Sequence, residues 1–155
     1  MIEQKGTMTD PLSHPQWLKA FVELYSQLGT NNLGLIKQVY HSDVHFSDPM
    51  HTVKGLDNLL HYFEQIYQHV TSCQFQIDHT FYQAHEAAIY WTMILCHKKL
   101  NGKRPITVQG HSHIKAENER VIFHRDYLDL GAMLYEHVPV LGYVITRIKH
   151  RASKP

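Results

Sequence analysis

Asp48 is the first residue in the sequence whose surroundings suggest chemistry. It lies between Phe46 and the Pro49-Met50 pair, in a short run typical of a strand. Apolar neighbours withdraw water from a carboxylate and make it a better proton acceptor, as a general base requires. An Asp-Pro pair is also a common turn former. The sequence therefore supports both a catalytic and a purely structural interpretation of Asp48.

His124 and Asp126 form a second candidate pair, two residues apart in a segment typical of a strand. Side chains at this spacing point to the same face of a sheet, and Leu128 shares that face. A histidine beside a carboxylate is a common acid–base device near neutral pH, and burying the two is costly unless they are paired. We interpret them either as part of a reaction site or as a bonded pair that completes a pocket wall.

Metal and cofactor chemistry find little support in the sequence. The 14 histidines show no ligand spacing such as HExxH, and the two cysteines form neither a CxxC site nor a disulfide scaffold. His111 and His113 share one strand face, but a metal site needs three or four converging ligands. There is no GxGxxG fingerprint and no P-loop. We therefore expect no metal site and no cofactor.

Length and composition indicate a single domain. The chain has 155 residues, of which 43% are hydrophobic and 19% charged, and its net charge is +1. It lacks the basic excess of a nucleic-acid binder. It has no apolar run of 18 residues and no leader-like start, which predicts a cytoplasmic protein without a transmembrane segment. We expect an arm at 1–12, one domain at 13–150 and a basic tail at 151–155.

The spacing of apolar residues predicts helices first and strands after them. Helical spacing predicts two longer helices with a short one between them: 15–28, 33–40 and 55–70. Alternating or continuous apolar runs predict one short and four long strands: 44–49, 72–77, 88–96, 106–114 and 121–130. Turns are expected at 101–103 and 117–119, and a final helix at 134–148. This order is typical of an α+β fold.

Five short motifs in this order resemble the SnoaL-like proteins of the NTF2-like superfamily. They are Phe21-Val22-Glu23-Leu24, Val44-x-Phe46-x-Asp48-Pro49, Gly55, Gly110-x-Ser112 and Arg125-Asp126-Tyr127-x-Asp129. The resemblance covers residues 15–130. It implies an NTF2-like cone, in which a curved antiparallel sheet wraps around a long helix and leaves an apolar space for a ligand. It also implies a homodimer formed through the open face of the sheet.

The resemblance also bears on individual candidate residues. Asp48 resembles the general-base aspartate of ketosteroid isomerase, but Phe21 and Gly110 stand where that enzyme has its two oxyanion donors. Asp126 resembles an acidic residue of limonene-epoxide hydrolase. The charged Arg-x-Asp pair that completes the hydrolase triad is replaced here by the uncharged run 91–95. Neither usual mechanism is complete in this sequence.

We therefore interpret the chain as a small-molecule pocket protein. The leading hypothesis is a cofactor-independent isomerase, lyase or hydrolase for a mostly apolar cyclic substrate. In it Asp48 is the general base, and His124 and Asp126 orient the substrate or relay a proton. One alternative is a non-catalytic ligand-binding or interaction module, and another is a membrane-associated accessory protein acting through its basic C-terminal helix. The residues expected to line the pocket are Phe21, Tyr25, Tyr40, Phe46, His51, Phe63, Trp91, Met93, Ser112 and Leu128.

Overall fold

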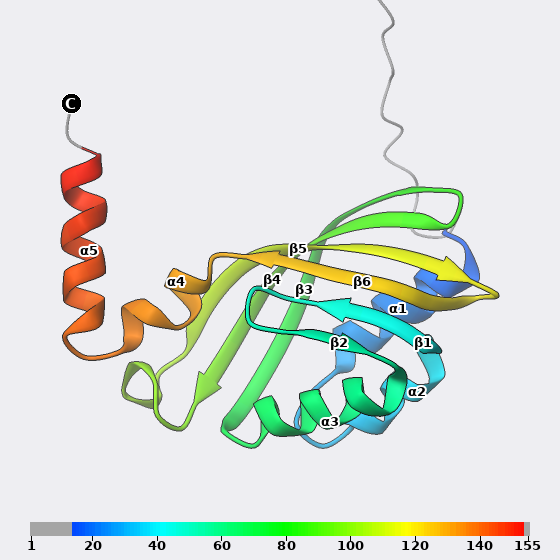
Figure 1. Cartoon of the computed structure of the whole chain (residues 1–155), viewed down its shortest axis with the longest axis horizontal. Helices are drawn as coiled ribbons and strands as arrows, with labels where there is room; N and C mark the ends of the chain where they lie inside the picture. Colours follow the sequence, from blue (N-terminus) through cyan, green and yellow to red (C-terminus); the bar gives the residue numbers. More distant parts are fainter. Residues whose placement is uncertain (1–13, 154–155) are drawn as a thin grey trace, which may run out of the picture.

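The computed structural model describes residues 14–153, so the predicted arm at 1–12 lies outside the described residues. It confirms the α+β cone, with helices against one face and at one end of a curved six-stranded sheet (Figure 1). The helices are α1 (Gln16–Gln27), α2 (Ile36–Val39), α3 (Leu56–Tyr67), α4 (Leu130–Met133) and α5 (Leu141–Ala152). Short 3-10 turns lie at η2 (Leu33–Leu35), η3 (Asn101–Lys103) and η4 (Tyr135–His137). Within residues 14–153, no helix has the length and apolar character to cross a membrane.

The six strands follow the order β2-β1-β6-β5-β4-β3. They are β1 (Tyr40–Ser47), β2 (Thr52–Lys54), β3 (Val70–Gln83), β4 (Glu86–His97), β5 (Ile106–Glu117) and β6 (Arg120–Leu128). The last four form the predicted meander of antiparallel hairpins. Two features were not predicted: β2 pairs with β1, and β1 runs parallel to β6. The sheet is therefore mixed, because one of its strand pairs is parallel.

The β1–β6 pairing matters for the site because it brings two distant segments together. In its register Phe46 lies opposite His124. The turn that contains Asp48 follows β1 directly, and Asp126 is two residues beyond His124 on β6. The two candidate carboxylates thus reach the same end of the sheet, although about half of the chain separates them.

Apolar faces of α1 and α3 fill the inside of the sheet. α3 begins after Gly55, whose φ of +83° is a conformation that glycine adopts without strain, and Asp57 in its first turn favours the helix dipole. Each helix buries residues three or four positions apart, as the sequence predicted. The buried residues are Trp17, Leu18, Phe21, Leu24 and Tyr25 on α1 and Leu59, Leu60, Tyr62 and Phe63 on α3.

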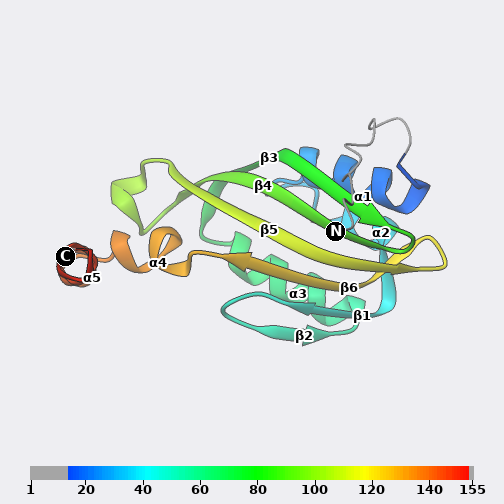
Figure 2. The same cartoon turned by 90° about the horizontal axis from the view of Figure 1, so that it is seen from above.

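The C-terminal helix begins later than predicted. α4 and η4 occupy most of residues 130–137, and α5 then runs from 141 to 152 across the expected boundary at 150. Pro139 has no N–H to continue a helix, and Val140 takes a φ of +70° before α5 starts. The chain changes direction here, so that α5 stands beyond one end of the sheet in both views (Figures 1 and 2).

Candidate functional site

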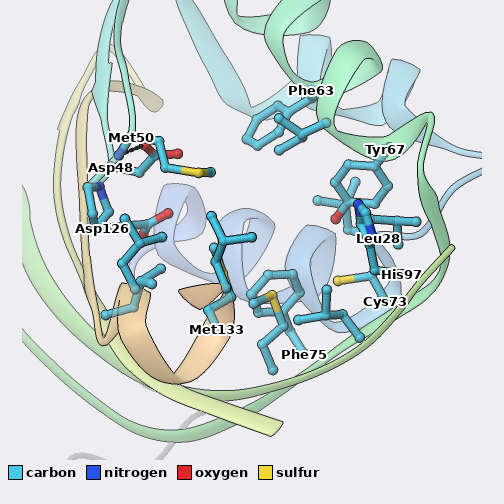
Figure 3. A pocket seen from close by; sticks show the side chains of 18 of the residues that line it. Leu28, Asp48, Met50, Phe63, Tyr67, Cys73, Phe75, His97, Asp126 and Met133 are labelled. Atoms are coloured by element: carbon cyan, nitrogen blue, oxygen red, sulfur yellow. Dashed lines mark hydrogen bonds between the residues drawn. The ribbon is translucent and has the colours of Figure 1, made fainter. Parts of the chain in front are cut away.

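A cavity of about 300 Å³ lies between α1, α3 and the inner face of the sheet, with α4 contributing to its wall (Figure 3). Its lining is mainly aliphatic and aromatic. Among the described residues, no lysine or arginine lines it. The predicted site residues that do line the cavity are Tyr25, Phe46, Asp48, Phe63, Trp91, Met93, Asp126 and Leu128.

Five predicted site residues do not line the cavity, and burial or exposure explains each. Phe21 and Tyr40 are buried in the core behind Tyr25. His51 is exposed, with its ring against Tyr62. The other two, Ser112 and His124, are buried and bonded to Asp126 from behind the wall.

Several lining residues were missed by the sequence analysis. Tyr67 follows Phe63 by four positions, a signal that was present but was assigned to the core. Leu130, Met133 and Leu134 were missed because the predicted strand continued through 130 and α4 was not foreseen. The other missed side chains that give the cavity its character are His69, Cys73 and His97.

Asp48 is engaged in the turn between β1 and β2. Its Oδ1 accepts the backbone N–H groups of Met50 at 2.7 Å and His51 at 2.8 Å, and its Oδ2 accepts the hydroxyl of Tyr62. Burial, reinforced by the Asp48 carboxylate, raises the pKa of Tyr62 far above its usual value, so this donor stays protonated. Both oxygens of Asp48 therefore stabilise local structure, which favours the turn-forming interpretation.

Asp126 is held from one side only. Its Oδ1 accepts a hydrogen bond from Ser112 Oγ at 2.5 Å and contacts His124 Nε2 at 2.7 Å. Ser112 is in turn fixed by the indole N–H of Trp91 at 2.8 Å. No donor from residues 14–153 reaches Oδ2, and the side chain retains 18% exposure whereas His124 has none. Asp126 thus offers one unengaged oxygen at the cavity wall (Figure 3).

A buried hydrogen-bonded chain continues behind Asp126. His124 Nδ1 lies 2.6 Å from the Tyr40 hydroxyl, which lies 2.8 Å from the Tyr25 hydroxyl. When Asp126 is ionised and the His124 ring is neutral, His124 donates through Nε2, so Nδ1 accepts from Tyr40 and Tyr40 accepts from Tyr25. Burial raises the pKa values of Tyr25 and Tyr40 well above the usual range. Because Tyr25 also lines the cavity, the chain begins and ends at the same cavity, on α1 and on β6.

The outward histidines do not form a metal site. His111 lies on the outer sheet face with its ring stacked on Tyr90 and Tyr127, and His113 bonds Glu86. Over residues 14–153 there is no group of three or more His, Cys, Asp and Glu side chains that could hold a metal ion.

Tyr67, Cys73 and His97 lie on the side of the cavity away from Asp48 and Asp126 (Figure 3). We expect Cys73 to alkylate slowly, because burial raises the pKa of its thiol and the Tyr67 hydroxyl only partly opposes this. Since the thiolate is the reactive form, its rate should keep rising with pH beyond the point where a free thiol levels off. The iodoacetamide rate of a Cys96→Ser variant measures this, and a profile like that of free cysteine would contradict it.

A curved α+β cone with a carboxylate at an apolar cavity defines a class of small ligand-binding domains. The chain belongs to the SnoaL-like domain family, whose pattern matches residues 19–124. Comparison with curated protein sequences gives no match.

Solved structures share this fold at low sequence identity. An NTF2-like protein of unknown function from Burkholderia pseudomallei superposes with a TM-score of 0.70 and 16% identity over 78% of this chain and 96% of its own. A putative SnoaL-like polyketide cyclase from Shewanella putrefaciens superposes with a TM-score of 0.66 and 20% identity over 78% of this chain and 95% of its own. An LEH-like epoxide hydrolase from M. tuberculosis superposes with a TM-score of 0.66 and 12% identity over 85% of this chain and 96% of its own. At these identities the likeness establishes the fold, and neighbours of this fold include proteins with different activities.

Proposed function

We propose that the protein is a cofactor-independent acid–base catalyst for a mostly apolar small molecule, with Asp126 rather than Asp48 as the proton acceptor. One observation carries the proposal: no donor within residues 14–153 engages Asp126 Oδ2 at the apolar cavity wall, while Oδ1 is fixed by Ser112 and His124. A carboxylate held in this way needs no reorganisation before it accepts a proton. His124 and Ser112 are positioning residues, since they touch Asp126 and not the cavity.

The charged groups around the cavity limit which classes of reaction the site can favour. The carboxyl groups of Asp126 and Asp48 line it, and no Lys or Arg side chain of the described residues does. An enolate-like intermediate would therefore meet no Lys or Arg counter-charge from the described residues, whereas the rings of Phe46, Phe63 and Trp91 can stabilise positive charge. Removal of a proton from carbon during dehydration or ring closure, or from the water that opens an epoxide, fits these surroundings better than enolisation. Among the reactions considered from the sequence, this favours a lyase or hydrolase.

A substrate panel tests the proposal. The full chain is incubated in D₂O with cyclic alcohols, epoxides and ketones, and products are followed by mass spectrometry for loss or gain of water or deuterium. We expect conversion of at least one alcohol or epoxide class, removed in the Asp126→Asn variant. Ligands that bind without any conversion would instead support the non-catalytic binding module. The homodimer and the cytoplasmic location remain predictions.

A further inference from the structure

α5 carries an apolar surface that the described part of the chain leaves uncovered. Leu141, Val144 and Ile148 are 42%, 43% and 60% exposed. With half-buried Ile145 they recur at helical spacing and form one continuous stripe, which we call the α5 stripe. The helix that bears it stands beyond the end of the sheet, joined to the body through α4 and η4 (Figures 1 and 2).

Specific contacts hold α5 in this position. Gly142 packs so closely against the backbone of Glu136 that a Cβ at this position would overlap it. Lys149 pairs with Glu136 and lies 3.6 Å from Asp129, the residue that caps α4. These contacts join α5 to both preceding helical segments, so the α5 stripe is presented in a defined orientation.

Basic residues border the α5 stripe on both edges, and Lys149 on one of these edges is paired with Glu136 and lies near Asp129. None of the 14 acidic residues follows Glu136, whereas four basic residues do, and two of these are Arg147 and Arg151. At 100° per residue, Arg147 and Arg151 border the stripe along one edge and Lys149 along the other. An apolar stripe with cations along its edges is the pattern of helices that lie in the surface of an anionic bilayer.

We propose that α5 docks on an anionic lipid surface, with the α5 stripe at the headgroup–acyl boundary and Arg147 and Arg151 against lipid phosphates. α4 lies just before α5 and places Leu130 and Met133 in the cavity wall. Docking through α5 therefore brings that wall close to the bilayer. The proposal goes beyond the acid–base function and does not depend on it.

A second copy of the chain fits the α5 stripe less well. The outer sheet face offers exposed apolar rings such as Tyr90 and Tyr127. The same face carries the cations Lys115 and Arg125, and its Glu86 is already bonded to Lys115 and His113. A helix edged by arginines would meet like charge there, whereas an anionic membrane offers the complementary sign.

Vesicle sedimentation of the full chain tests the proposal. We expect binding to vesicles of two parts phosphatidylcholine and one part phosphatidylserine, weakened by salt, and none to phosphatidylcholine alone. At about 1 kcal/mol per cation near the surface, Arg147→Gln with Arg151→Gln should lower the affinity on the order of 30-fold. Lys37→Gln with Lys54→Gln is the matched control. It removes two exposed cations far from α5 and should change the affinity little.

A second pair of variants tests the α5 stripe itself. Val144→Ser with Ile148→Ser should abolish sedimentation while circular dichroism and thermal unfolding stay close to those of the parent. Three results would overturn the proposal. They are no binding to either kind of vesicle, equal binding to both kinds, or an equal loss of affinity in the arginine double variant and in the lysine control. If light scattering shows that the serine variant turns a dimer into a monomer and neither form binds vesicles, a second copy covers the stripe instead.

Discussion

Asp126→Asn is expected to lower kcat/KM by about two to four orders of magnitude, the usual contribution of a general base. The amide keeps the size of the carboxyl group but can neither take a proton nor serve His124 and Ser112 with an anionic acceptor. Asp48→Asn changes the same atoms in a carboxylate whose oxygens are already occupied by the turn and by Tyr62. We expect it to lower kcat/KM by less than about tenfold.

The Asp48→Asn variant should also show an effect on stability. Asp48→Asn weakens hydrogen bonds to a charged acceptor, and we expect it to reduce the free energy of unfolding by about 1.5–3 kcal/mol. Urea denaturation of both variants and steady-state kinetics on the substrate found in the panel measure the two effects. If Asp48→Asn loses activity and Asp126→Asn retains it, Asp48 is the base, as first inferred from the sequence.

Gly110→Ala is expected to reduce the free energy of unfolding by about 1–3 kcal/mol and to move the Trp91 ring. A Cβ at Gly110 would lie 2.7 Å from both Trp91 Cζ2 and the backbone oxygen of Tyr127. The backbone of Tyr127 belongs to the neighbouring strand of the sheet and cannot move away, so the Trp91 indole must shift. Its hydrogen bond to Ser112, which supports Asp126, should weaken as a result.

A matched glycine variant makes this test specific. Gly34→Ala adds the same methyl group where nothing lies within 4 Å. Urea denaturation should place Gly34→Ala near the parent and Gly110→Ala well below it. Trp17 and Trp91 are the two tryptophans of the chain, so fluorescence in a Trp17→Phe background reports on Trp91 alone. An unchanged spectrum in Gly110→Ala would show that the packing tolerates the added methyl.

The same glycine relates the family resemblance to the observed site. Sequence comparison placed Gly110 where ketosteroid isomerase has an acidic oxyanion donor. Here the indole of Trp91 covers the space above that glycine. A side chain at position 110 and the Trp91 ring on β4 would occupy the same space, so they exclude each other. An alignment of single positions does not reveal this link.

Alternation along β6 predicted the right face for His124, Asp126 and Leu128 but not their depth. All three lie on the inner side of the sheet, yet only Asp126 and Leu128 line the cavity. His124 lies deeper because β1 runs beside this part of β6 and packs Phe46 against its ring. A two-residue period specifies the side of a strand, whereas the distance to a cavity depends on packing between distant segments.

Asp48 illustrates the limits of local chemistry. The Asp-Pro pair left a base and a turn former equally possible, and both interpretations used only neighbouring residues. The groups that favour the turn are the backbone of the β1–β2 connection and the hydroxyl of Tyr62. β2 is three residues long, too short for a period to be recognised, and Tyr62 was hidden within the apolar stripe of α3.

The side chains of Tyr25, Tyr40, His124 and Asp126 depend on one another, because they form one buried hydrogen-bonded chain. The Tyr40 hydroxyl and the His124 ring each bond two neighbours in it, and Tyr25 and Asp126 form its ends. A single replacement leaves a neighbouring polar group unmatched in the core, which is costlier than exchanging several members at once. We therefore expect substitutions at these four positions to be non-additive, so that replacing a bonded pair together costs less than the sum of the two single replacements.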